Sequence, residues 1–157
     1  MKKMYLFIVV CLMSTMSAFA QSSMTQAQLS FRNQIERFLK EEGFFPTIDT
    51  DDNSVNFKRE GSKFWITVEG KTPFYIEIHK GGFTLEGTNQ QLILEACNQA
   101  NSSKRWAKAY AGSSSVSFSV EFYCPSIDVF TQVFYKALSS LDSSKEAAQD
   151  YYNEHDN

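Results

Sequence analysis

Two neighbouring segments alternate between apolar and polar residues, and this alternation constrains the fold more than any other feature. Residues 63–69 read KFWITVE and residues 74–79 read FYIEIH. Successive side chains of a β-strand point to opposite faces, so each segment predicts a strand with one apolar and one polar face. The connection between them holds Gly70 and Pro73, which is typical of a turn. The sequence therefore predicts antiparallel strands with one buried side.

The rest of the chain supplies further strands and three helices. Shorter alternating runs predict strands over 55–58, 105–111 and 116–123, while Gly81–Gly82 is expected to break the run before a short apolar piece at 83–85. Apolar residues at three- and four-residue spacing predict helices over 23–42, 88–103 and 125–141, the first two opened by capping boxes at Ser23 and Thr88. A polar tail is expected from about residue 142, either as a frayed end or as a projecting polar helix. The order α-β-β-β-α-β-β-α predicts a single α+β domain over residues 21–157, with an antiparallel sheet of about five strands and three helices.

The junction after the first helix reads FLKEEGFFPTID. Gly43 supplies a left-handed stop, and Leu39 and Phe44 are spaced to make the hydrophobic contact of a Schellman ending. Pro46 then biases Phe45 toward an extended conformation. The sequence leaves Phe45 either facing the core at the sheet edge or exposed.

The N-terminus reads MKKMYLFIVVCLMSTMSAFAQ, with two lysines, an apolar run from Tyr5 to Met13 and small residues around 18–20. This pattern predicts a secretory signal peptide over residues 1–20 and a periplasmic or secreted protein. The apolar run is about half of the roughly 20 residues that a spanning helix needs, so no membrane span is expected after cleavage. Without Lys2 and Lys3, 13 basic and 18 acidic residues leave a formal charge near −5. That balance disfavours nucleic acid as a partner.

Four segments in this order resemble the bacterial YbjN family: FLKEEGFFPTID, NFKREGSKFWITVEG, ILEACNQANSSKRWAKAYAG and SVEFYCPSIDVFTQVFYKAL. The likeness covers about residues 30–142 and depends on order and pattern rather than on a catalytic signature. The resemblance implies a fold similar to type III secretion chaperones, which work as homodimers that hold client segments. Family members are described as proposed sensory transduction regulators, so the resemblance implies a regulatory or chaperone-like protein, and the predicted signal peptide would make this chain an exported variant.

Candidate chemistry is sparse. Asp49, Asp51, Asn53 and Glu60 fall at positions 1, 3, 5 and 12 of a calcium loop, but serine replaces the glycine of position 6 and a strand follows, so a solvated turn is expected. His79 and His155 are the only histidines, and no serine sits in a nucleophile elbow. The sequence predicts no catalytic residue, no metal and no cofactor.

Cys97 and Cys124 are the two cysteines that remain after signal cleavage. Export to an oxidising compartment allows a disulfide between them. Cys97 also falls on the apolar stripe of the second helix, and two cysteines alone say nothing about geometry, so two buried free thiols are the favoured interpretation.

One constellation suggests a function. If the alternating apolar side chains of the strands face the helices, the opposite face carries five aromatic side chains among charged residues: Trp65, Tyr75, Trp106, Tyr110 and Tyr123. Trp and Tyr are enriched in protein interfaces. The same residues also fit cross-strand pairs that stabilise the sheet, or a face covered by the second helix.

The leading hypothesis is thus a non-enzymatic exported domain that binds another protein or its own copy through this face or an edge strand. An alternative is a carrier of a small ligand, with a pocket between sheet and helices. A hydrolase built on His79 is the third and least favoured hypothesis.

Overall fold

The computed structural model describes residues 24–84, 89–112 and 115–156. The bounds of its elements are α2 Gln26–Glu41, β1 Thr47–Ile48, β2 Val55–Arg59, β3 Ser62–Glu69, β4 Phe74–Thr84, α3 Gln90–Ser103, β5 Lys108–Ala111, β6 Ser115–Cys124 and α4 Ile127–His155. The predicted α+β class and the order of the helices are confirmed. The signal peptide predicted for residues 1–20 lies outside the described residues.

The strands form one antiparallel sheet in the order β1-β2-β3-β4-β6-β5. It has six strands where the sequence predicted about five, because the two residues of β1 pair with β2. The β2–β3 hairpin turns at Glu60 and Gly61, which both have positive φ, at 50° and 76°. Positive φ at both central residues gives the type I′ turn that suits the right-handed twist of a hairpin.

β4 continues through Gly81 and Gly82 to Thr84, so the predicted break there is wrong. The pairing with β6 shifts register between Gly81 and Thr84, as a bulge does. A Cβ on Gly82 would lie 2.5 Å from the carbonyl oxygen of Val116 and 2.8 Å from the Phe118 ring. Glycine therefore lets β4 pass close to β6 instead of ending the strand.

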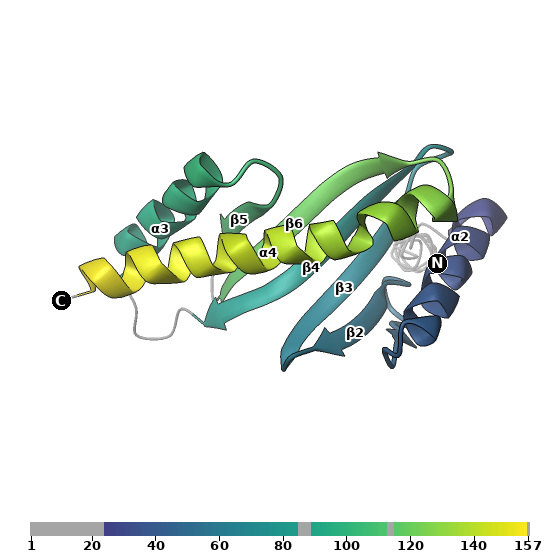
Figure 1. Cartoon of the computed structure of the whole chain (residues 1–157), viewed down its shortest axis with the longest axis horizontal. Coiled ribbons are helices and arrows are strands. Elements are labelled where there is room, and N and C mark those ends of the chain that lie inside the picture. Colours follow the sequence, from purple (N-terminus) through teal and green to yellow (C-terminus); the bar gives the residue numbers. More distant parts are fainter. Residues whose placement is uncertain (1–23, 85–88, 113–114, 157) are drawn as a thin grey trace, which may run out of the picture.

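The three helices among the described residues pack on the same side of the sheet (Figure 1). Figure 1 shows α4 running along the sheet, with α2 near one end of α4 and α3 along the other. The Phe31 ring of α2 lies 4.8 Å from the Phe74 ring of β4, and Phe134 of α4 lies 5.9 Å from Phe57 of β2. The core between these layers contains fully buried side chains from sheet and helices: Phe64, Ile66, Ile76, Ile78, Phe118, Ile35, Leu39, Phe130, Phe134, Leu138 and Leu141.

The C-terminal end of α2 was predicted correctly from the sequence, whereas its N-cap residue was not. The capping box is formed by Thr25 and Gln28, not by Ser23, which lies outside the described residues. At the other end the Phe44 amide donates to the Leu39 carbonyl (2.9 Å) and the Gly43 amide to the Lys40 carbonyl (3.1 Å), with Gly43 at φ 84°. These are the two hydrogen bonds of the predicted Schellman ending.

The two phenylalanines after this helix have separate environments. Phe44 packs on the rings of Phe57 and Phe134, at 5.1 and 6.1 Å. Phe45 is 93% exposed. The alternative that the sequence left open is thus decided in favour of exposure.

The sequence left the segment from about residue 142 either to fray or to continue as a polar helix, and α4 extends to His155, so the segment is helical. Ser144 and Ala148 continue the buried stripe of Leu141, and this part of α4 packs against α3. Small side chains allow two helices to approach closely, but serine and alanine do not stand out as an apolar pattern. Although α4 has 29 residues, neither it nor another helix among residues 24–84, 89–112 and 115–156 is apolar enough to cross a membrane.

A charged contact also joins α4 to the sheet. Lys80 lies on the helix side of β4, between its register partners Phe64 and Phe118, and its ammonium contacts the carboxylate of Asp142. Arg59 reaches the second oxygen of that carboxylate at 3.4 Å. The Lys80 side chain is 7% exposed and that of Asp142 is 36% exposed. The sequence pattern gave no sign of this pair.

Candidate functional site

The side of the sheet opposite the helices, hereafter the outer face, has a row-by-row order set by strand register. One row across β2, β3, β4 and β6 consists of Asn56, Trp65, His79 and Ser119; the next holds Thr67, Glu77 and Glu121; the last holds Glu69, Tyr75 and Tyr123. Among the residues that the structure describes, each helix packs on the other side. The outer face is therefore a sheet surface of aromatic and acidic side chains.

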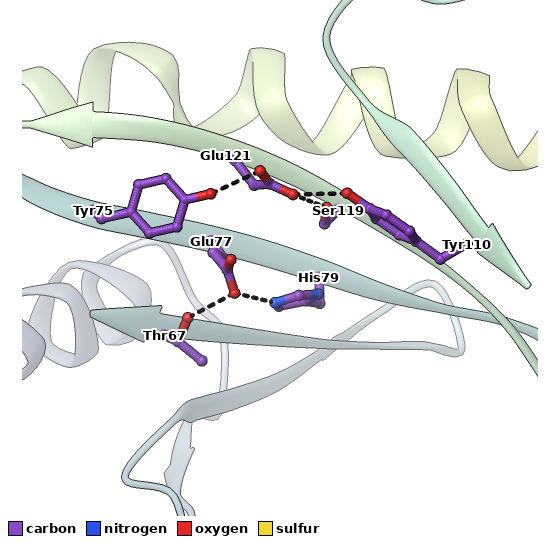
Figure 2. A network of polar contacts seen from close by, with 7 residues as sticks. All are labelled: Thr67, Tyr75, Glu77, His79, Tyr110, Ser119 and Glu121. Carbon is purple, nitrogen blue, oxygen red and sulfur yellow. Dashed lines mark hydrogen bonds and ion pairs between the residues drawn. The ribbon is translucent and has the colours of Figure 1, made fainter. Parts of the chain in front are cut away.

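Glu121 of β6 is the centre of one polar network on the outer face (Figure 2). Its Oε2 accepts a hydrogen bond from the Tyr75 hydroxyl at 2.7 Å. Its Oε1 accepts from the hydroxyls of Tyr110 and Ser119, each at 2.9 Å. Three hydroxyl donors from β4, β5 and β6 thus converge on one carboxylate.

These hydrogen bonds determine the charge state of Glu121. The Tyr75 and then the Tyr110 hydroxyl hold the pKa of the Glu121 carboxyl below its ordinary value, because donors stabilise the charged form. The hydrogen bond to Glu121 raises the pKa of Tyr75. Burial, together with its own hydrogen bond to Glu121, raises the pKa of Tyr110. At neutral pH, Glu121 is a carboxylate held by neutral tyrosines.

Glu77 lies directly opposite Glu121 in the β4–β6 register and has its own contacts. His79 Nε2 is 3.0 Å from Glu77 Oε2, and the Thr67 hydroxyl donates to the same oxygen at 3.4 Å. Like charges directly opposite on neighbouring strands are destabilising. The two glutamates nevertheless face each other with hydroxyls and an imidazole around them, as Figure 2 shows.

Aromatic rings flank both networks. The Trp65 ring stacks on the His79 ring, with centroids 4.9 Å apart and an interplanar angle of 6°. The Tyr75 and Tyr123 rings lie 5.4 Å apart, and Tyr123 is 70% exposed. Trp65, Tyr75, Tyr110 and Tyr123 therefore share the outer face, as the alternation predicted.

The prediction for Trp106 is wrong. β5 begins at Lys108, so the alternation of the strand does not extend back to residue 106. The Trp106 ring lies 6.0 Å from Phe122, whose ring also contacts Phe130 of α4 at 6.5 Å. Trp106 is thus partly buried against the core on the helix side. Ser119 also belongs to the outer face, and the alternation of residues 116–123 is the signal that could have predicted its position there.

The network gives little support to a hydrolase based on His79. A nucleophilic hydroxyl has to be activated by an adjacent base. The Thr67 and Ser119 hydroxyls instead donate to the carboxylates of Glu77 and Glu121. The imidazole is held between a carboxylate and an indole ring, which orients it.

Other candidate sites have ordinary structural explanations. In the turn before β2, the Asp49 carboxylate accepts from the Asp51 amide and the Asp52 carboxylate from the Ser54 amide, at 2.9 and 2.8 Å. Asn53 has φ 61° there, and a strand follows. Within the described ranges, no three His, Cys, Asp or Glu side chains gather in a way that could hold a metal.

Cys97 of α3 and Cys124 of β6 are free, buried thiols in this structure. Burial raises the pKa of both, because the thiolate is poorly solvated there. The Cys124 thiol donates to the Ser126 carbonyl at 3.1 Å. Both side chains are part of the core, and no disulfide joins them here.

Two depressions bear on the carrier hypothesis. One of about 530 Å³ lies beside the exposed Phe45 and is lined by Phe57, Lys58 and Lys63. Another of about 510 Å³ lies where the start of α2 meets the end of β3, and its lining includes Asp52 and Glu69. Ligand sites are mostly apolar with a few polar groups. The carboxylates in the second depression suit a polar ligand rather than an apolar one.

The architecture is thus an α+β domain in which the helices of the described residues cover one face of the sheet and leave the other open (Figure 1). Among solved structures, the crystal structure of YbjN from E. coli, a proposed transcription regulator, matches it with a TM-score of 0.60. The match covers 76% of this chain and 92% of that chain at 9% sequence identity. No family model and no curated protein matches the chain. At this identity the likeness shows the fold alone, and the resemblance drawn from the sequence is confirmed at that level.

Proposed function

We propose that the chain is an exported, non-enzymatic domain that binds another protein through the outer face of its sheet, in a regulatory or chaperone-like role. The observation that carries the proposal is the aromatic and acidic surface that the described helices leave open. Tyr123 is 70% and Tyr110 is 44% exposed on it. Tyrosine supplies a large contact area at low entropic cost, which is why it is enriched in interfaces. The YbjN-like fold supports a regulatory or chaperone-like class.

The edges of the sheet are poor alternatives to its face. Exposed strand edges attract other strands unless they are short or covered. The Asn101 side chain of α3 accepts from the Ala109 amide at 2.7 Å and donates to the Ala109 carbonyl at 3.0 Å, so it occupies the outward backbone groups of this β5 residue. At the other edge, β1 has two residues and follows Pro46, which has no amide proton. A partner therefore has more to contact on the face.

Site-specific photo-crosslinking in the native host tests the choice of face. A photo-reactive phenylalanine analogue replaces Tyr123 on the outer face or, as control, Leu94 of α3, which is 50% exposed. We expect a discrete crosslinked protein from position 123 that is lost when Tyr75→Ala is added, and none from position 94. The same adduct from both positions, or none from position 123, would count against the face. Export has its own test, because N-terminal sequencing should give Gln21, whereas a retained Met1 would contradict it.

A further inference from the structure

The arrangement of charge on the outer face indicates the chemistry of the partner segment. Glu69, Glu77 and Glu121 occupy the two neighbouring rows that also contain Tyr75 and Tyr123. Lys58 and Lys63 oppose each other at the far end of the β2–β3 hairpin. The three glutamates of the face therefore lie in its two rows that are furthest from Lys58 and Lys63.

The carboxylates of Glu77 and Glu121 have few basic side chains near them within the described residues. Among the residues described, the imidazole of His79 is the only basic side chain within 4.0 Å of the Glu77 carboxylate, and no lysine or arginine is that close to Glu121. Lys108 acts on Glu121 through space without forming an ion pair. The two opposed carboxylates are contacted by hydroxyl groups and one imidazole, and a cation between them would relieve their repulsion.

We infer that the outer face docks a basic segment of a partner protein, with an arginine seated between Glu77 and Glu121 and against the Tyr75–Tyr123 pair. This inference rests on the proposed function and names the partner's chemistry. A guanidinium presents several N–H donors in a plane and stacks on aromatic rings, so it can contact carboxylates and the exposed Tyr123 ring together. A lysine ammonium is a point charge and uses the rings less well.

Fluorescence anisotropy with labelled hexa-arginine, hexalysine and hexaglutamate peptides tests this on the purified protein. We expect hexa-arginine to bind more tightly than hexalysine, and hexaglutamate not to bind. The double substitution Glu77→Gln and Glu121→Gln should weaken hexa-arginine about tenfold, since it removes two partly shielded charges that face the ligand. The matched control Glu146→Gln with Glu154→Gln removes the same charge from exposed positions of α4 and should change binding less than about twofold.

The variant Tyr123→Ala tests the same inference if the double variant Glu77→Gln, Glu121→Gln does not fold. Tyr123 makes a ring contact but is largely exposed, so Tyr123→Ala should leave the thermal midpoint unchanged. Loss of its ring should weaken hexa-arginine about two- to fivefold and hexalysine less. Equal weakening by the outer-face and α4 double variants would show that net charge alone attracts the peptide, and would overturn the inference. So would an unchanged affinity in the outer-face variants.

The failure of this inference is distinguishable from that of the proposed function. If the crosslink from position 123 persists undiminished in the Glu77→Gln, Glu121→Gln chain, the face binds a protein but the basic anchor is wrong. If hexa-arginine binding follows the outer-face variants while no crosslink forms at position 123, the basic-ligand chemistry holds and the protein-binding role does not.

Discussion

Asp142→Asn provides the most quantitative test of the fold, because it removes the charge that faces the buried Lys80 ammonium. Lys80 lies between Phe64 and Phe118 in register, and its ammonium is 5.5 Å from the centre of the Phe64 ring. Removing one partner of a buried ion pair typically costs about 3–5 kcal/mol. The carboxylate here is 36% exposed, so water can partly replace it, and we expect a loss of about 2–3 kcal/mol.

The measurement is urea unfolding at neutral pH, followed by tryptophan fluorescence and far-ultraviolet circular dichroism. For a chain of 157 residues, this loss corresponds to a fall in Tm of about 5–10 °C. Asp150→Asn makes the same chemical change at an exposed position of the same helix and should cost less than about 0.5 kcal/mol. The pair of variants thus separates the contact with Lys80 from a general effect of charge on α4.

The double variant Lys80→Met with Asp142→Leu completes the test. It replaces a charge pair by apolar side chains, which is often neutral or stabilising once neither charge is left alone. We therefore expect it to be more stable than Asp142→Asn by about 1–3 kcal/mol. The reasoning is refuted if Asp142→Asn is as mild as Asp150→Asn, or if the double variant is no more stable than Asp142→Asn.

Three further predictions concern the strand bulge, the helix junction and the acidic network. Gly82→Ala should cost about 1–3 kcal/mol because its Cβ meets β6, whereas Gly81→Ala, whose nearest contact would be at 3.8 Å, should be nearly neutral in the same unfolding assay. Phe44→Ala should cost about 2–3 kcal/mol and Phe45→Ala less than about 0.5, and equal losses would contradict the packing of this junction. The lowered pKa of Glu121 contributes stability that is present above its unfolded pKa and is lost as pH falls through the folded value. The difference in unfolding free energy between the wild type and Glu121→Gln should therefore shrink between about pH 5 and pH 3, and a constant difference would contradict the network.

The elements with strong local signals were predictable from sequence. Alternation placed β3 and the first part of β4 because a half-buried strand has to repeat every two residues. The ending of α2 was predictable in detail, since Gly43 and Phe44 meet the stereochemical needs of one motif. Trp65, Tyr75, Tyr110 and Tyr123 were placed on the correct face by the same parity.

What escaped prediction depends on contacts between distant segments. The bulge at Gly82 depends on how closely β6 approaches β4. From the sequence alone, the same glycine predicts the end of a strand. Trp106 does not lie on the outer face because β5 begins at Lys108, later than the alternation over residues 105–111 predicted. The pair of Lys80 and Asp142 joins residues 62 positions apart, and the opposition of Glu77 and Glu121 follows from strand register, which periodicity does not specify.

The length and position of α4 have a consequence for the synthesis of this protein. Its 29 residues follow all six strands in sequence, and they cover strands that are made earlier. Until α4 emerges from the ribosome, the apolar side of the sheet lacks the helix that packs along it. Phe64, Ile78 and Phe118, which are buried in the complete fold, belong to this side. Incomplete chains with exposed apolar surface and strand edges are prone to aggregate. The core is therefore complete only once α4 has been made, and a truncation that removes α4 should produce an insoluble sheet rather than a smaller domain.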